Sequence, residues 1–304
     1  SIILKILPIS YLENFKTIQK SAVSLNLYPK IIFTSTLHVV SDVFKIWVSG
    51  RVKKGSKLIL SDHGFYLEDE IDFNLWKKIA YKYVKWNLTK KKNCYQLPPN
   101  ILLGRKKLDV VKNNNNFLIV LNSEPFYLKS FNFSKQPLAV YKNMKKFVHL
   151  FDKTKKKNFY FRPHPTEFNW RADKNISNDF GKKQIDNNKN FFQSIRNYKL
   201  IINTVPLTTF LETMFSGKPS IVLEHQSFVN LHKDVKELIV TMKDNKIIFN
   251  DIELAKKHLI NIWDNPLEWW NSKKILSIRS EFQRVCSLKT KDDFSEWYNF
   301  LKKL

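Results

Sequence analysis

The sequence predicts an α/β fold with two Rossmann-like domains, the first of them incomplete, and a group of carboxyl-terminal helices. Short runs of β-branched and aromatic residues alternate with segments of helical periodicity, a pattern typical of βαβ units and a largely parallel sheet. The length of 304 residues suits two domains. Apolar residues make up 43% of the chain, which is enough for packed cores.

The first domain is predicted over residues 1–112, with strands at 31–34, 57–60, 83–86 and 101–103. Between the first two strands, Ser41-Asp42 can cap a helix whose apolar residues recur at helical spacing up to Val48. The chain begins with Ser1 and runs directly into the apolar segment 2–7. We therefore expect that sequence upstream of this domain is missing.

The second domain is predicted over residues 117–304, after a polar linker at 113–116. Its strands are expected at 117–121, 158–161, 200–203, 220–223 and 247–249, with helices at 138–151 and 209–215. Three further helices are predicted at 251–263, 268–287 and from 292 to the end, and Trp269, Trp270, Trp297 and Phe300 are expected to pack in a core.

Composition narrows the function classes. Two cysteines, Cys94 and Cys286, favour neither a disulfide framework nor a thiolate metal site. No uninterrupted apolar run reaches the roughly 18 residues of a spanning helix, and no signal-peptide pattern is visible. These observations predict a cytoplasmic protein with reduced cysteines.

The net charge of +25 has three interpretations: a codon-driven excess of lysine, attraction to anionic lipid or a phosphorylated substrate, and nucleic-acid binding. The lysines are scattered in small clusters, and no zinc-finger, RNA-recognition or basic-zipper pattern accompanies them. Nucleic acid is therefore the least favoured partner, and peripheral contact with an anionic membrane at its inner face remains an expectation.

His63-Gly64 follows the predicted strand 57–60 directly. Ligands of open α/β sheets bind beyond the carboxyl ends of the strands, and an imidazole there can accept a proton from an attacking hydroxyl. A histidine that only bonds to a loop carbonyl is the alternative. The predicted strand 158–161 ends in Arg162-Pro163-His164-Pro165, where two prolines stiffen the backbone and Arg162 and His164 can contact phosphate. A rigid strand exit with solvated side chains is the alternative there.

The segment 203–212 joins a predicted strand to a predicted helix and contains Thr204, Thr208, Thr209 and Glu212. Backbone N–H groups and threonine hydroxyls at a helix start form a ready anion site, and Glu212 can accept hydrogen bonds from ribose hydroxyls. Thr209 and Glu212 also have the spacing of a capping box, which explains Glu212 without a ligand. No glycine-rich dinucleotide motif, P-loop or Asp-x-Asp motif is present, and the acids at 68, 69, 70 and 72 lack metal-ligand spacing. The expected chemistry is therefore independent of metal and of cofactors.

With these segments in order, the chain resembles a family of transferases encoded in bacterial surface-carbohydrate clusters, over nearly its whole length. The resemblance rests on Leu7-Pro8 with Tyr11, Glu13 and Phe15, on 29–35 and 42–47, and on Trp263, Trp269-Trp270, Arg279 and Phe282. Members of that family are usually much longer.

At greater distance, His63-Gly64, 162–165 and 208–219 are similar to motifs of CDP-glycerol glycerophosphotransferases and capsule Kdo transferases, which have the GT-B architecture. The resemblance implies transfer of a sugar or polyol phosphate from a nucleotide-activated donor to a surface-carbohydrate or lipid-linked acceptor. It implies His63 as catalytic base, Arg162 and His164 on the phosphates, and the threonines and Glu212 on the nucleotide.

The sequence departs from those transferases after His63-Gly64, where they have a glycine-rich run and this chain has 65–69, and at Asn87, where they have glycine. Both changes lie near the implied acceptor site. A non-catalytic nucleotide- or carbohydrate-binding protein of the same fold is therefore the alternative function.

Overall fold

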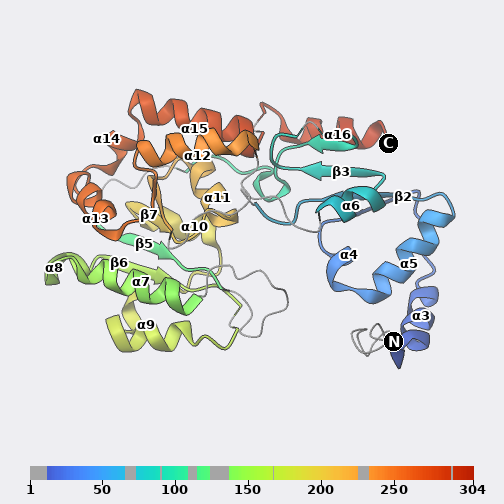
Figure 1. Ribbon diagram of the computed structural model, residues 1–304, viewed down its shortest axis with the longest axis horizontal. Coiled ribbons are helices and arrows are strands. Elements are labelled where there is room, and N and C mark those ends of the chain that lie inside the picture. Colours follow the sequence, from blue (N-terminus) through green and yellow to red (C-terminus); the bar gives the residue numbers. More distant parts are fainter. Residues whose placement is uncertain are drawn as a thin grey trace. The chain divides into compact units, whose positions relative to one another are not determined.

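The computed structural model describes residues 12–65, 73–89, 91–108, 115–123, 137–166, 168–224, 233–288 and 290–304. The chain forms two compact units, and Figure 1 labels many of their elements. Unit 1 comprises Ser1–Gly64, Glu70–Pro99 and Thr290–Leu304, and unit 2 comprises Phe65–Asp69 and Asn100–Lys289. This division differs from the predicted domains 1–112 and 117–304, chiefly because the last helix belongs to unit 1. Of the predicted linker, residues 113 and 114 lie outside the described part of the chain.

The sheet of unit 1 contains four parallel strands in the order β1-β2-β3-β4. Their bounds are β1 (Ile31–Thr34), β2 (Lys57–Ser61), β3 (Lys82–Lys85) and β4 (Cys94–Gln96). The first three were predicted. The predicted strand at 101–103 is wrong, because the first two of these residues belong to a short 3₁₀ helix, η1 (Asn100–Leu102). The unpredicted β4 is a three-residue edge strand without an apolar run.

The helices of unit 1 are α3 (Phe15–Ser24), α4 (Leu37–Val40), α5 (Asp42–Lys53), α6 (Phe73–Ile79) and α16 (Asp293–Lys302). Ser41 caps α5 as expected, since its side chain accepts a hydrogen bond from the Phe44 N–H over 3.2 Å. One side of the sheet packs on α5 in a core to which Ile32 and Phe44 belong. Successive strand residues point to opposite faces, so Phe33 faces the other side.

Helix α16 packs on that other side. The ring of Trp297 contacts Phe33 with centroids 5.7 Å apart, and Phe300 contacts Tyr95 at 5.3 Å. The indole N–H of Trp297 donates to the Pro98 carbonyl over 2.8 Å. The prediction that Trp297 and Phe300 are core residues is confirmed, since both are 8% exposed, but they complete unit 1 and not the second domain.

The sheet of unit 2 contains five parallel strands in the order β6-β5-β7-β8-β9. They are β5 (Phe117–Val120), β6 (Phe159–Arg162), β7 (Leu200–Asn203), β8 (Ser220–Leu223) and β9 (Ile248–Phe249), each close to its predicted position. Every residue of β5, β7 and β8 is buried, as expected of parallel strands covered on both faces. Two parallel sheets with flanking helices confirm the α/β class.

The α-helices of unit 2 are α7 (Pro137–His149), α8 (Lys153–Lys156), α9 (Ala172–Phe180), α10 (Phe191–Ser194), α11 (Thr208–Ser216), α12 (Lys233–Asp244), α13 (Ile252–Asn261), α14 (Pro266–Trp270) and α15 (Lys273–Cys286), and the 3₁₀ helices are η1, η2 (Lys182–Gln184) and η3 (Ile195–Asn197). Residues of α7, α9 and α13 share one core cluster with β5 to β8. Helices α12 and α15 lie side by side (Figure 1).

The predicted helix 268–287 is two helices, because the chain leaves helical geometry at Asn271-Ser272 between α14 and α15. The indole of Trp270 is fully buried, and Trp269 packs against the main core, so the core prediction for this pair is confirmed. Within the described residues, none of the helices combines the length and the apolar character that a membrane span requires.

Candidate functional site

The strands β5, β6 and β7 end at one edge of the sheet of unit 2. The chain passes from β5 to β6 on one side and then crosses to β7 on the other, so the strand order reverses around β5. Such a switch point leaves a crevice beyond the carboxyl ends of the strands, the usual ligand position in open α/β sheets. Beyond the strands, Leu121 N–H donates to the Arg162 carbonyl over 3.0 Å and Thr204 N–H to the Val120 carbonyl over 3.2 Å. The Arg-Pro-His-Pro turn follows β6 and the threonine-led segment follows β7. Both segments therefore start at the same edge of the sheet, on either side of β5.

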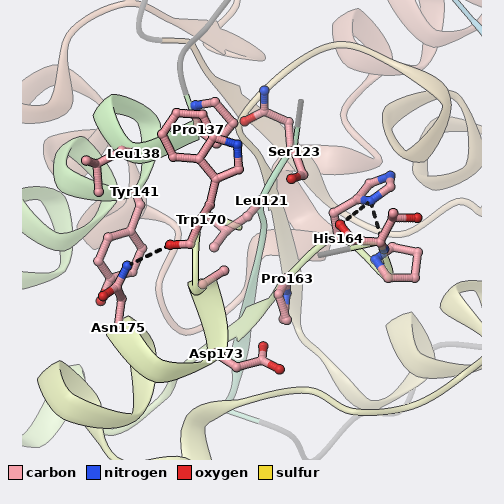
Figure 2. A pocket seen from close by; sticks show the side chains of 14 residues that line it. Leu121, Ser123, Pro137, Leu138, Tyr141, Pro163, His164, Trp170, Asp173 and Asn175 are labelled. Atoms are coloured by element: carbon pink, nitrogen blue, oxygen red, sulfur yellow. Dashed lines mark hydrogen bonds between the residues drawn. The ribbon is translucent and has the colours of Figure 1, made fainter. Parts of the chain in front are cut away.

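A cavity of about 90 Å³ opens at this edge between the ends of β5 and β6 and the starts of α7 and α9 (Figure 2). Of the residues predicted as site residues, His164 is the one that lines it. The other lining residues that Figure 2 labels include Ser123, Tyr141, Trp170, Asp173 and Asn175. His164 is exposed, and its Nδ1 accepts a hydrogen bond from the Thr166 N–H over 3.1 Å. This bond holds the imidazole across the turn, with Nε2 as its second polar atom.

Hydrogen bonds hold several of the residues that line the cavity. Asn175 Nδ2 donates to the Trp170 carbonyl over 3.2 Å (Figure 2), and the residues on both sides of Trp170, Asn169 and Arg171, have positive φ angles of 68° and 52°. The Tyr141 hydroxyl donates to Asp179 over 2.7 Å, and Lys145 pairs with the same carboxylate at 2.6 Å. Burial is the main reason why the pKa of Tyr141 is raised, so the phenol stays neutral as a donor.

Arg162 is engaged elsewhere. Its Nη1 lies 2.5 Å from the Asp186 carboxylate, and the two side chains are 12% and 8% exposed. Ser194 Oγ donates to the same carboxylate over 2.6 Å, and the guanidinium lies 5.4 Å from the centre of the Phe191 ring. The structure thus places the charge of Arg162 in a buried ion pair, and not on the edge where its sequence neighbour His164 is exposed.

Thr204 does not present its hydroxyl to the edge. The residue is 1% exposed, and its Oγ1 donates to the Val120 carbonyl over 2.8 Å. The N–H of the same residue donates to the same carbonyl. Thr204 therefore joins β7 to β5, and the sequence-based expectation that its hydroxyl contacts phosphate lacks support from this geometry.

The start of α11 lies one residue earlier than predicted. The cap residue is Leu207, without a side-chain cap, and Thr208 and Thr209 are the first two helical residues. The first N–H groups of an α-helix have no intrahelical acceptor, and the positive end of the helix dipole lies there. The alternative interpretation of Thr209 and Glu212 as a capping box is wrong, because Thr209 is inside the helix and Glu212 pairs with another residue.

That partner is Arg105, whose Nη1 bonds to Glu212 Oε1. Glu212 is 5% exposed, and its burial raises the pKa of the carboxyl, against the opposing effect of Arg105. Thr208 Oγ1 accepts a hydrogen bond from the Phe65 N–H over 3.0 Å. Of the α11 residues predicted as site residues, Thr209 is half-buried at the first turn, close to the helix start.

In unit 1, His63 follows β2 and is exposed, as predicted for a residue at a strand end. The neighbouring Asp62 holds the loop in place, since its Oδ2 accepts from the Trp86 N–H over 2.8 Å and its own N–H donates to the Val84 carbonyl over 2.9 Å. The loop that bears His63 is therefore tied to the end of β3. Asn87, where the similar transferases have glycine, is 5% exposed directly after Trp86.

Sequence reasoning missed Arg105 and Asp186. Arg105 is 107 positions from Glu212, and Asp186 is 24 positions from Arg162, so no local spacing signals either pair. Among the residues that the structure describes, no group of three or more His, Cys, Asp or Glu side chains could hold a metal ion. The acidic residues 68–70 and 72 lie outside the described ranges.

The fold and this edge define a two-unit α/β protein of the GT-B type. Two solved structures illustrate the likeness. MurG of Acinetobacter baumannii is 7% identical, with a TM-score of 0.54, over 98% of this chain and 81% of that protein. The spinosyn rhamnosyltransferase SpnG is 9% identical, with a TM-score of 0.51, over 94% and 79% of the two chains. At such identities the likeness is one of fold.

The chain belongs to the LIC12162 family of transferases, whose pattern it matches over residues 1–301. This finding agrees with the resemblance to transferases noted in the sequence. No curated protein matches the chain.

Proposed function

We propose that the protein transfers a sugar or polyol phosphate from a nucleotide-activated donor to a surface-carbohydrate or lipid-linked acceptor. The observation that carries the proposal is the common edge in unit 2, where exposed His164 and the amino terminus of α11 leave strands on either side of β5. Membership of a transferase family and the GT-B-type fold support it.

In this proposal the donor phosphates lie at the start of α11, where the N–H groups of Thr208 and Thr209 face an anion and the helix dipole favours negative charge. His164 donates from its second ring nitrogen to a phosphate oxygen. The buried carboxylate of Glu212 accepts from the ribose hydroxyls. Thr204 and Arg162 support the edge through Val120 and Asp186, and so they shape the site without contacting the donor.

His63 is the proposed general base. A base must accept the proton of the acceptor hydroxyl as that oxygen attacks the donor, and the leaving nucleotide takes up the negative charge. Exposure at a strand end and a loop fixed by Asp62 suit that task. The proposed mechanism uses neither a metal nor another cofactor.

Nucleotide binding is the first test. Thermal unfolding with each common nucleoside diphosphate should reveal one or more that raise the unfolding temperature, because a ligand at 100 times its Kd stabilises the native state by about 2.7 kcal/mol. His164→Ala should weaken that stabilisation, whereas His149→Ala, at an exposed position of α7, should not. The absence of stabilisation by every nucleotide would overturn the proposal.

Turnover is the second test. With the donor so identified, His63→Ala should lower the rate of transfer by about 10²–10⁴ while donor affinity stays unchanged. An unchanged rate would remove His63 from the mechanism.

A second candidate is a nucleotide-binding protein without transfer activity. It is favoured by one contact: Thr208, expected on phosphate, has its hydroxyl oxygen bonded to the Phe65 N–H in the segment that departs from related transferases. Calorimetric binding of nucleotide, with no donor consumed in the presence of candidate acceptors, would support this candidate over the first.

The cellular setting follows from the proposed substrates. Nucleotide-activated donors are cytoplasmic, and a lipid-linked acceptor would bring the protein to the anionic inner face of the membrane. The net charge of +25 supports such peripheral contact. Sedimentation with vesicles containing about one-third phosphatidylglycerol should be strong at low salt and weak at high salt. Equal sedimentation with neutral vesicles would contradict an electrostatic attachment.

A further inference from the structure

The Glu212 carboxylate lies in the second turn of α11 and is 5% exposed. A carboxylate is costly to bury unless it is paired and hydrogen-bonded. Its partner, Arg105, comes from the segment that follows η1. This segment is held at both ends: Arg105 N–H donates to the Leu102 carbonyl over 3.1 Å, and Leu108 N–H donates to the Ser216 carbonyl at the end of α11 over 3.0 Å.

The guanidinium of Arg105 is held on a second side by an aromatic ring. It lies 4.7 Å from the centre of the Phe192 ring, and Phe192 in turn packs on Phe215 of α11 with centroids 6.3 Å apart. The Arg105 side chain is 28% exposed, so the ion pair reaches the surface on one side. Gly104 takes a φ of 69° immediately before Arg105, a left-handed conformation that glycine adopts without strain.

Burial and two arginines shift the pKa of the Glu212 carboxyl. Burial raises the pKa of its carboxyl, Arg105 lowers it by charge and by hydrogen bonding, and Arg162 of β6 lowers it further from a longer range. The charge of Arg162 is itself paired with Asp186. Contact with Arg105 is thus the larger of the two effects that favour the carboxylate.

We propose that Arg105 is a positioning residue for the nucleotide-activated donor: it holds the Glu212 carboxylate by Oε1 so that Oε2 can accept hydrogen bonds from the ribose hydroxyls. This inference rests on the proposed function. Arg105 acts through Glu212 and through its stacking on Phe192, and it does not contact the reacting atoms.

The experiment compares a ribonucleoside diphosphate with its 2′,3′-dideoxy analogue, because the analogue keeps the phosphates and lacks both hydroxyls. Wild-type protein should bind the ribonucleotide more tightly. In Arg105→Gln that preference should shrink by about 10- to 100-fold, the range of a hydrogen bond to a charged group, while affinity for the analogue stays within about twofold. Arg105→Lys should keep part of the preference, and Arg196→Gln, at an exposed arginine of the same unit, should keep all of it.

The pH dependence adds a readout that a merely structural role would not change. Without Arg105, no contacting cation opposes the effect of burial, so the pKa of the Glu212 carboxyl should rise. As the pH is lowered, Glu212 should therefore become protonated, and the preference for the ribonucleotide lost, at a higher pH in Arg105→Gln than in wild type. In Glu212→Gln the preference should be small at every pH. If Arg105→Gln folds poorly, the double variant Arg105→Gln/Glu212→Gln removes both charges of the pair and should behave as Glu212→Gln does.

The outcomes are separable. A wild-type protein that binds neither nucleotide overturns the proposed function and this inference with it. A wild-type protein that prefers the ribonucleotide, with an Arg105→Gln variant that keeps the full preference and the same pH dependence, overturns the role of Arg105 alone.

Discussion

The backbone N–H of Phe65 donates a hydrogen bond to Thr208 Oγ1 over 3.0 Å. Phe65 is 1% exposed, and its ring contacts Phe282 of α15 with centroids 5.6 Å apart. The residue that follows His63-Gly64 in the sequence is therefore anchored on the first turn of α11 and on α15, within unit 2. A buried N–H needs an acceptor, and this one depends on a single hydroxyl.

Thr208→Val should destabilise the protein by about 1–3 kcal/mol, because the buried Phe65 N–H would lose its acceptor while the shape of the side chain is kept. Thr208→Ser keeps the hydroxyl and should cost less. Thermal unfolding of both variants measures the difference. Equal melting temperatures for the two would show that the hydrogen bond contributes little.

Arg162 should prove important for stability even without nucleotide. Arg162→Met leaves the buried Asp186 carboxylate without its cation, which should cost about 3–5 kcal/mol. The double variant Arg162→Met/Asp186→Leu removes both charges and should recover much of that loss. Urea denaturation of unligated protein is the measurement. A single variant as stable as wild type would instead favour a direct role of Arg162 in binding phosphate.

We expect the buried His258 to make the protein less stable in acid. It is 5% exposed between the rings of Phe249 and Trp269, and burial lowers its pKa to about 4. The unfolded chain, with an imidazole pKa near 6.5, binds the proton first as the pH falls. The contribution of neutral His258 to the free energy of unfolding is therefore fully present above about pH 6.5. It is lost progressively between that pH and about 4, by roughly 2–3 kcal/mol.

The variant His258→Leu should lack this part of the acid dependence, whereas His149→Leu, at an exposed histidine, should retain it. Unfolding midpoints measured from pH 7.5 to 4.5 provide the comparison. Parallel curves for wild type and His258→Leu would contradict the assignment to His258.

The last helix should stabilise unit 1 and not unit 2. Trp297→Ala removes the contacts with Phe33 and the hydrogen bond to the Pro98 carbonyl, and truncation of a buried tryptophan costs about 3–5 kcal/mol. Hydrogen exchange should accelerate in β1 and β4, with β5 and β7 unaffected. Acceleration confined to the strands of unit 2 would contradict the assignment of α16 to unit 1.

Strands were predictable where the apolar pattern of one short segment determines the structure. The uninterrupted apolar runs at 117–121, 200–203 and 220–223 can be buried on both faces of a parallel sheet, and the structure places β5, β7 and β8 there. The strand predicted at 101–103 is wrong, because this apolar run follows Pro98-Pro99, precedes Gly104 and pairs with none of the strands in the described ranges. At β4 the reverse holds: pairing with β3 makes a strand from residues without a strand pattern.

The candidate site was predictable in part for the same reason. Placement at strand ends follows from local pattern, so His63, His164 and the start of α11 all lie at the carboxyl ends of strands. The capping-box prediction was wrong because the spacing of two residues does not show which partner a side chain will bind. Glu212 pairs with Arg105, which lies 107 positions away in the sequence.

By itself the sequence determined the α/β class, most strands and the residue types at their ends, because hydrophobic periodicity and turn residues act over a few positions. Only the tertiary structure decided which charges meet: Arg162 with Asp186, and Arg105 with Glu212. It also decided that Trp297 completes unit 1. Such pairs depend on how distant segments are brought together by burial of the whole core, and a buried charge takes the partner that the packed chain places beside it.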